Sequence, residues 1–267
     1  MKNKKIIATF SFLGIVLLFS ILAMKTNDIT VTTSNATLSN VKIGWGIKRN
    51  NNHEQPDLGS NNKKLIDEND DIAMGNKDDK FVYLTFDMGY EAGYTEKILN
   101  ILKGNDVKAA FFITGHYLNS ASELVERMIK EGHTVGNHTV NHHSMPDLED
   151  EKLKDEITKL HTAVYEKFGY EMKYLRPPKG EYSQRTLAIA KSLGYTNVMW
   201  SFAYDDWDEQ KQGREEYAKE KILSNMHNGC VILLHATSKD NCNILDEVIK
   251  EIKNMGYQLK TLDEFKR

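Results

Sequence analysis

The residues best suited to catalysis in this sequence each come directly after a short apolar segment that is expected to form a β-strand. When parallel strands form a barrel, the loops at their carboxyl ends meet on one face, and catalytic side chains collect there. We therefore expect these reactive groups, each from a separate strand, to share one pocket. They are Asp87 after residues 81–86, His138 after 134–137, Arg176 after 173–175, Asp206 after 197–203 and His235 after 230–234.

Two histidines have a spacing that suits a metal ion. His138 and His142 are four residues apart, which would put both imidazoles on one side of a helical turn, where they can hold one cation. Most pairs with this spacing are packed or surface histidines, and the adjacent His143 leaves open which imidazole is the second ligand. The position of His138 after a strand favours the metal interpretation. Imidazole ligands suit a divalent transition metal, zinc above all.

The other reactive residues also have ordinary structural explanations. Asp87 could cap a helix, Arg176 could be a solvated residue of a surface turn, and His235 could be a packed histidine at a strand end. No single residue decides between these explanations and catalysis. Because the set occupies equivalent positions at successive strand ends, we interpret it as an active site.

The charge balance argues against one class of partner. The net charge is −3, from 35 basic and 38 acidic side chains that are well mixed along the chain. Nucleic-acid binding calls for a clustered basic face. We therefore expect no nucleic-acid partner.

The first 77 residues differ in composition from the rest. Lys2, Lys4 and Lys5 precede an uncharged apolar run over residues 6–24, a pattern typical of a membrane anchor or a signal peptide. We expect residues 1–25 to be an uncleaved membrane anchor rather than a cleaved signal, with the enzyme outside the cytoplasm in either case and secreted if cleavage occurs. Residues 26–77 are predicted to be a polar linker that becomes an ordered lead-in near Trp45.

The remaining sequence alternates short apolar segments with amphipathic ones. This order predicts a parallel sheet with right-handed crossovers. We expect a distorted (β/α) barrel of about seven parallel strands with helices outside; an open doubly wound sheet is the alternative, but no glycine-rich phosphate loop supports it. Cys230 and Cys242 are expected to be buried free thiols. The helices are predicted at residues 94–103, 120–132 with a Ser120/Glu123 capping box, 150–168, 183–194, 215–227 and 244–255, and two further strands at 107–114 and 257–261.

Five short motifs in this order resemble the polysaccharide deacetylase family, carbohydrate esterases related to chitooligosaccharide deacetylase. The family domain would cover residues 78–267. The stretches around Trp45-Gly46 and Gly89-Tyr90-Glu91 are more similar to a branch that de-N-acetylates muramic acid and forms muramic δ-lactam in the spore cortex. The motifs are Thr85-Phe86-Asp87, His138 with His142, Arg176-Pro177-Pro178-Lys179-Gly180-Glu181-Tyr182, Asp206-Trp207 and Leu233-Leu234-His235.

The resemblance implies a role for each matched residue. His138 and His142 would hold the metal, and Asp87 would act as the general base on the attacking water. His235 would protonate the leaving amine. The supporting roles fall to Arg176 as the partner of Asp87, Asp206 as the partner of His235, the backbone N–H of Tyr182 as an oxyanion donor and Trp207 as a residue packed behind the acid.

One position departs from the family pattern. The family usually has a second aspartate after the base as a third metal ligand, and this sequence has Met88 there. A thioether is a poor ligand for the cations expected, so we predict weaker metal binding than in relatives with three ligands. Glu91 could supply a carboxylate, although a substrate contact or a surface role is the better interpretation.

The resemblance favours metal-dependent de-N-acetylation of N-acetylmuramic acid in peptidoglycan, with the glycan strands as partner and any accessory protein left open. An N-acetylglucosamine deacetylase acting on peptidoglycan or chitin-like oligomers is the first alternative. A glycan-binding protein that has lost catalysis is the second. The presence of both Asp87 and His235 argues against the second, because binding alone needs no matched base and acid.

Overall fold

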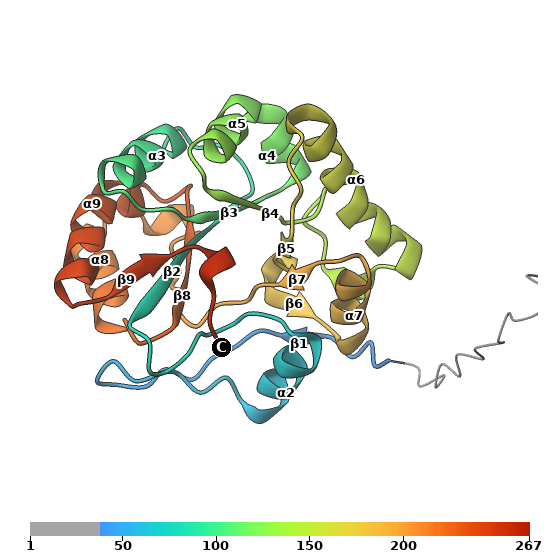
Figure 1. Ribbon diagram of the computed structural model, residues 1–267, viewed down its shortest axis with the longest axis horizontal. Helices are drawn as coiled ribbons and strands as arrows, with labels where there is room; N and C mark the ends of the chain where they lie inside the picture. Colours follow the sequence, from blue (N-terminus) through green and yellow to red (C-terminus); the bar gives the residue numbers. More distant parts are fainter. Residues whose placement is uncertain (1–37) are drawn as a thin grey trace, which may run out of the picture. The chain divides into compact units, whose positions relative to one another are not determined.

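A curled sheet of seven parallel strands forms the centre of the computed structural model, which describes residues 38–267 (Figure 1). The strand order is β7-β5-β4-β3-β2-β8, and β9 pairs with the first half of β2. Every pair in this sheet is parallel, as expected for the predicted barrel-type α/β fold. The strands are β2 (Phe81–Met88), β3 (Ala110–Ile113), β4 (Thr134–Asn137), β5 (Tyr174–Leu175), β7 (Thr196–Asn197), β8 (Cys230–His235) and β9 (Gln258–Lys260).

Helices surround this sheet on its outer side, as Figure 1 shows. Most of them bury an apolar face against the strands in the main hydrophobic core, whereas the buried residues of α2 (Ser60–Asn69), Leu65 and Ile66, belong to a smaller cluster with Tyr182, Leu187 and Met199. The predicted alternation of strands and helices is therefore confirmed. The helices are α2 (Ser60–Asn69), α3 (Thr95–Gly104), α4 (Gly115–Ser120), α5 (Ser122–Lys130), α6 (Asp150–Phe168), α7 (Gln184–Ser192), α8 (Glu215–Ser224) and α9 (Lys239–Asn254).

The alternation of side chains along β2 decides which residues face the inside of the curl. Phe86 and Met88 pack into the main core against the helices, whereas Tyr83 belongs to a separate inner cluster that contains no residue of an α-helix. Successive side chains of a strand point to opposite faces, so Asp87 shares the inner face with Tyr83. The register also pairs Asp87 with His235 on β8. Two chemically reactive groups thus become neighbours through strand pairing alone.

The strand predicted at residues 197–203 is shorter than expected. Only Thr196–Asn197 forms a ladder, and the chain then crosses from β5 to β8, where Phe202 makes a single bridge to Ile232. The carbonyl oxygens of Val198 and Met199 accept hydrogen bonds from the Arg176 side chain, so they are not available to a neighbouring strand. This segment closes the gap in the curled sheet.

The predicted helix over residues 120–132 is wrong in its start. Thr114 caps the short helix α4 by accepting a hydrogen bond from the backbone N–H of Tyr117, so helical structure begins earlier. The expected capping box is not formed, because the Ser120 hydroxyl donates to the carbonyl of His116 and Ala121 stands at the start of α5. Helix α9 also starts earlier than predicted, at Lys239, since the Ser238 side chain caps it.

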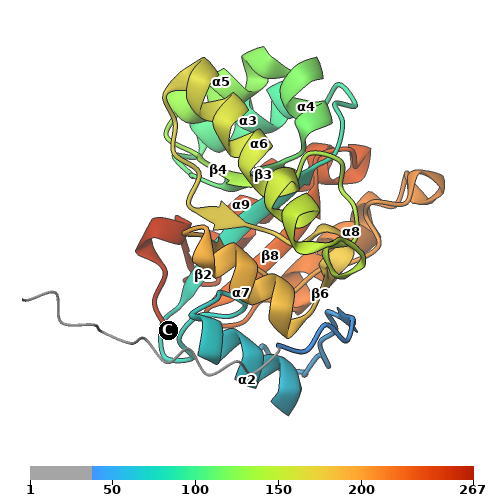
Figure 2. The same ribbon diagram turned by 90° about the vertical axis from the view of Figure 1, so that its right-hand side faces the viewer.

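Residues 38–77 pack against residues 78–267. Strand β1 (Ile43–Gly44) pairs antiparallel with β6 (Glu181–Tyr182), and α2 lies beside α7 in Figures 1 and 2. The Trp45 indole N–H donates to the carbonyl of Trp200 at 2.9 Å, and Arg49 donates to the carbonyl of Ala203. This lead-in therefore supports the segment that closes the sheet.

Two other expectations concern the chain as a whole. Cys230 and Cys242 are buried free thiols, as predicted. The anchor or signal predicted at residues 1–25, and the linker up to residue 37, lie outside the described residues. Within residues 38–267, no helix combines the length and the apolar composition that a membrane span requires.

Candidate active site

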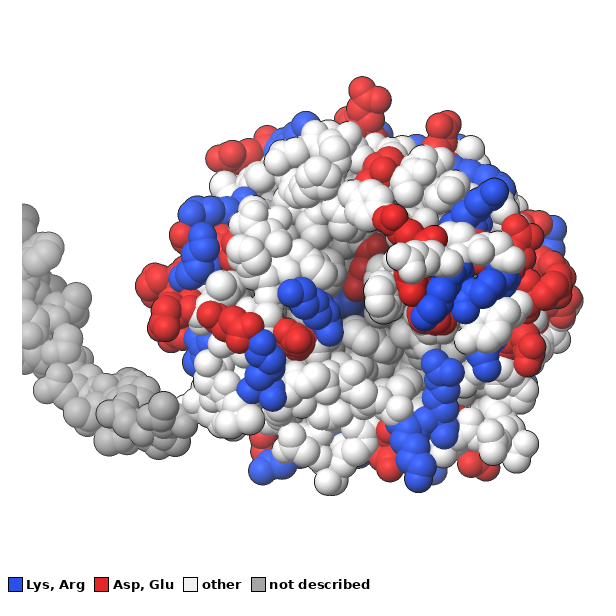
Figure 3. Space-filling view, turned by 180° about the vertical axis from the view of Figure 1, so that it is seen from behind, with Lys and Arg blue, Asp and Glu red and all other residues white. Residues whose placement is uncertain are grey.

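A cavity of about 1170 Å³ opens at the carboxyl ends of the strands, on the side that carries the predicted reactive residues. Figure 3 shows the molecule from behind relative to Figure 1, and the face seen in Figure 3 is hollowed near its centre. Of the predicted residues, Asp87, His138, His142, His235 and Trp207 line the cavity. Arg176 and Asp206 lie buried behind it.

Asp87 is held by a buried arginine. The Arg176 Nη1 atom donates to Asp87 Oδ1 at 2.8 Å, and Arg176 is 0% exposed. Burial alone would raise the pKa of the Asp87 carboxyl, but the charges of Arg176 and His235 and the hydrogen bond from Arg176 outweigh burial and hold that pKa below its usual value. Asp87 is therefore ionised at neutral pH, with Oδ2 free to accept a proton.

The guanidinium of Arg176 is fixed on all sides. Its Nε donates to the carbonyl of Val198 at 2.9 Å, and its plane lies over the Phe112 ring with 4.2 Å between the guanidinium carbon and the ring centroid. A buried charge is stable only when it is paired and its donors are satisfied. Arg176 therefore fixes the geometry of Asp87 and does not itself reach the cavity.

His138 presents one ring nitrogen to the cavity. Its Nδ1 atom lies 2.8 Å from the carbonyl oxygen of Arg176. A carbonyl only accepts hydrogen bonds, so Nδ1 carries the proton and Nε2 keeps its lone pair. Burial lowers the pKa of His138, although Asp87 opposes this effect, and Nε2 lies 3.5 Å from Asp87 Oδ2. A neutral imidazole in this tautomer is ready to bind a cation.

The second imidazole reaches the same place without a helix. The helical turn predicted for His138 and His142 is wrong, because Thr139 and His142 have left-handed backbones with φ of 65° and 57°. The Asn137 side chain accepts from the N–H of Thr139, whose hydroxyl accepts from the N–H of His142. This compact loop brings the two rings to a centroid distance of 4.7 Å. Burial is the main cause that lowers the pKa of His142, to about 4.

A glutamate that sequence reasoning missed secures this loop. Glu156 is buried on α6, and its carboxylate accepts from both the backbone N–H and the side-chain amide of Asn141, at 2.8 and 2.6 Å. Its own backbone carbonyl accepts from the N–H of Val140. The signal was present in the sequence, because Glu156 shares the apolar face of its helix with Leu153 and Ile157.

The second charge pair lies on the neighbouring strand. His235 Nδ1 is 2.8 Å from Asp206 Oδ1, and the backbone N–H of His235 donates to Asp206 Oδ2 at 2.7 Å. Burial acts to lower the pKa of His235, but the adjacent Asp206 carboxylate outweighs burial and holds that pKa above its usual value. His235 is thus suited to carry a proton at neutral pH, with Nε2 directed away from Asp206.

Asn241 is a second residue that sequence reasoning missed. Its amide nitrogen donates to Asp206 Oδ2 at 2.6 Å, and its amide oxygen accepts from the Tyr204 hydroxyl. Since Asn241 comes from α9 and Tyr204 from the loop before α8, no local sequence pattern joins them. This amide fixes the orientation of the Asp206–His235 pair.

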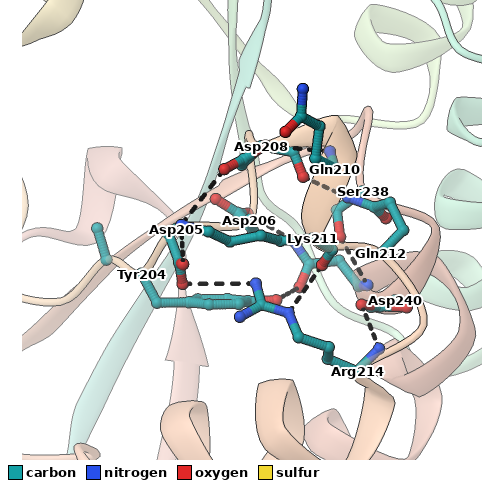
Figure 4. Close-up of polar contacts among 12 residues, drawn as sticks. Tyr204, Asp205, Asp206, Asp208, Gln210, Lys211, Gln212, Arg214, Ser238 and Asp240 are labelled. Carbon is teal, nitrogen blue, oxygen red and sulfur yellow. Dashed lines mark hydrogen bonds and ion pairs between the residues drawn. The ribbon is translucent and has the colours of Figure 1, made fainter.

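The loop over residues 204–214, which carries Asp206, is held in place by a network of polar contacts, as Figure 4 shows. Lys211 pairs with Asp205 at 2.8 Å and with Asp208 at 3.3 Å. The backbone N–H groups of Gly213 and Arg214 donate to the buried carboxylate of Asp240 at 2.8 and 2.9 Å. In Figure 2 the orange segment after β7 projects from the molecule. These contacts tie the loop to the start of α9.

Replacing Asp206 with asparagine should move the alkaline limb of the pH–rate profile to lower pH. His235 must be protonated to act as an acid, and its raised pKa keeps activity present up to a higher pH. Loss of the carboxylate charge should lower the controlling pKa by about one to three units. The measurement is kcat/KM against pH. Asp205→Asn is the matched control, because Asp205 lies on the same loop and pairs with Lys211 instead; equal shifts in both variants would contradict the assignment.

The donor set fits a divalent transition metal with open coordination positions. His138 and His142 supply two neutral imidazoles, a ligand type that zinc prefers. Met88 is no substitute for a third ligand, because it is fully buried in the core on the far side of β2. Within residues 38–267, no three His, Cys, Asp or Glu side chains form a metal-ligand cluster. Any ion would therefore complete its shell with water or substrate.

The structure also places Tyr182, Trp207 and Glu91, and the expected oxyanion role of the Tyr182 backbone N–H stays a prediction. Tyr182 is fully buried, pairs with Ile43 on β1 and does not line the cavity; from the same turn, Lys179 and Gly180 do. Trp207 does not pack behind the acid but is 62% exposed at the cavity. The Glu91 carboxylate accepts hydrogen bonds from the N–H groups of Gly93 and Thr95, at the turn that leads into α3.

Comparisons with known proteins agree with this geometry. Residues 74–198 match the family model described as polysaccharide deacetylase. The chain is 46% identical over 232 residues to a 30.6 kDa protein of Geobacillus stearothermophilus, covering 86% of this chain and 88% of that one. It is 40% identical over 226 residues to the peptidoglycan-N-acetylmuramic acid deacetylase PdaA of Bacillus subtilis, covering 84% and 86%. The solved structure of PdaA, described as a family 4 carbohydrate esterase, matches with a TM-score of 0.83 at 39% identity, covering 85% of this chain and 98% of that chain.

Proposed function

Because this chain belongs to the polysaccharide deacetylase family of hydrolases, we propose that it removes the acetyl group from N-acetylmuramic acid in peptidoglycan. The observation that carries the proposal is the pairing of Asp87 with His235 across neighbouring strands, each held by a buried partner of opposite charge. Binding a glycan requires neither pair. Hydrolysis of an amide requires a group that takes a proton and a group that gives one.

The first step uses Asp87. Its free carboxylate oxygen accepts a proton from a water molecule as the water oxygen attacks the acetyl carbonyl carbon. Arg176 keeps the carboxylate ionised and fixes its direction. Since His138 Nε2 lies 3.5 Å from Asp87 Oδ2, the base and the imidazoles act on the same small volume. A divalent ion held by His138 and His142 would polarise the acetyl carbonyl there.

The second step uses His235. The carbon–nitrogen bond of the tetrahedral intermediate breaks, and the proton on Nε2 passes to the departing sugar nitrogen. The products are acetic acid, which carries the hydroxyl group of the water, and a free amine. The proton left on Asp87 passes to solvent, and His235 takes up a proton from solvent before the next turnover. The Asp206 carboxylate stabilises the imidazolium before the transfer and holds its orientation during it.

The similarity to PdaA supports muramic acid as the sugar. A free amine at C2 of muramic acid lies next to the lactyl group on O3, so closure between them gives muramic δ-lactam. We propose that the product serves this closure in the spore cortex. We also propose an extracytoplasmic, membrane-anchored enzyme, supported by the basic and apolar pattern of residues 1–25; a reporter fused after residue 25 that stays in the cytoplasm would contradict this location.

The proposed function is tested by acetate release from defined glycans. The full chain, with residues 1–25 in detergent, is incubated with glycan strands freed of peptide and with N-acetylglucosamine oligomers, with and without a chelator. We expect acetate from the first substrate, a mass loss of one acetyl group on muramic acid, and loss of activity with the chelator that zinc restores. Deacetylated glucosamine alone would favour the first alternative, and glycan binding without any acetate would favour a binding protein.

A further inference from the structure

Lys179 is the one lysine or arginine side chain that lines the cavity within the described residues. It is exposed and, over residues 38–267, takes part in no ion pair and no side-chain hydrogen bond. The other basic side chain of the site, Arg176, is buried and fully used by Asp87 and by backbone carbonyls. Lys179 therefore offers a free cation to whatever enters the cavity.

The backbone around Lys179 is fixed in place. Lys179 has a left-handed backbone, with φ 60° and ψ 6°, and it lies between Pro178 and Gly180. A Cβ added to Gly180 would lie 2.8 Å from the Trp200 ring, so the turn packs tightly on this side. The ammonium group thus moves only with its own flexible stem, while the Cα position is set by the fold.

The position of Lys179 relative to the reacting groups is also defined. Lys179 follows Arg176 by three residues in the same turn, and it lines the same cavity as Asp87, His138 and His142. The Lys179 side chain therefore shares one cavity with the two imidazoles. A sugar that enters this cavity with its N-acetyl group at Asp87 is bound beside the wall that carries Lys179.

We infer that Lys179 recognises the lactyl carboxylate of N-acetylmuramic acid and so selects this sugar over N-acetylglucosamine. The inference rests on the proposed function. N-acetylmuramic acid differs from N-acetylglucosamine only by the lactyl ether on O3, next to the N-acetyl group on C2. That ether ends in a carboxylate when no peptide is attached, and an ammonium group is a natural partner for it.

The test combines a change in the Lys179 side chain with a change in the substrate, and compares the effect of each change alone with the effect of both together. Lys179→Met removes the charge at similar length and with the same backbone demand, and Lys179→Arg keeps the charge. The substrates are peptide-free glycan oligomers and the same oligomers with the lactyl carboxylate converted to a methyl amide. Lys152→Met, on the exposed side of α6 and outside the cavity, is the matched control for overall charge.

We expect Lys179→Met to lower kcat/KM on the free carboxylate substrate by about 10- to 100-fold, mainly through KM, the loss typical of one charge-assisted hydrogen bond. On the methyl amide substrate, kcat/KM of this variant should stay within about twofold of the value for the unmodified chain. This substrate already lacks the carboxylate that Lys179 contacts, so removing the ammonium group costs nothing further. Lys179→Arg should keep most activity, and Lys152→Met should change neither substrate.

Two results would overturn the inference, and they differ in what else they overturn. Equal loss on both substrates would give Lys179 a structural role and leave the proposed function intact. No acetate from either glycan with the unmodified chain would overturn the proposed function and this inference together.

Discussion

Replacing Asp87 with asparagine is expected to lower kcat by about 10²- to 10⁴-fold, the usual contribution of a general base. Asparagine has nearly the same shape as aspartate and can still accept a hydrogen bond from Arg176, but it cannot take a proton from water. The measurement is the rate of acetate release at saturating glycan. Activity near that of the unmodified chain would refute the role of Asp87.

The same substitution has a cost in stability that must be separated from catalysis. Arg176 is fully buried, so the loss of its counter-ion leaves a charge supported only by neutral acceptors and by the Phe112 ring. Breaking a buried pair costs about 3–5 kcal/mol. Thermal unfolding should therefore be recorded beside each rate. Asp71→Asn is a control for the loss of a buried carboxyl group, because Asp71 lies outside the cavity and accepts from the Asn197 side chain; the kcat of this variant should not change.

Replacing His138 with alanine is expected to abolish metal binding at micromolar zinc and acetate release with it. Loss of a residue that merely orients a ligand weakens binding by about 10- to 100-fold, so loss of one of two imidazole ligands should cost more. The effect should be larger than in relatives with three protein ligands, since Met88 offers no replacement. Elemental analysis of the dialysed protein gives the metal content.

His143→Ala is the control that also settles which histidines bind. His143 is 57% exposed at its side chain, lies 3.9 Å from Glu156 and does not line the cavity. It should keep both metal and activity. Stoichiometric zinc in the His138→Ala protein, or its loss in the His143→Ala protein, would contradict the assignment of the ligands.

Much of the fold was readable from the sequence because its signals are local. The strand at Thr134–Asn137 and the helix from Asp150 to Phe168 have the predicted bounds, since the period of apolar residues reports directly which face is buried. The segment after Asn197 was misjudged, because its carbonyls bond to the distant Arg176 side chain instead of a neighbouring strand. The spacing of apolar residues in the sequence does not indicate a hydrogen-bond partner that is distant in the chain.

The sequence by itself determined that Asp87, His138 and His235 stand at strand ends, and parallel pairing then brings strand ends to one edge. Only the tertiary structure decided the tautomer of His138, the left-handed loop that delivers His142, and the exposure of Lys179 at the cavity. The tautomer depends on the carbonyl of Arg176 and the loop is secured by Glu156, both of which come from other parts of the chain. Such contacts exist only once the sheet has curled and closed.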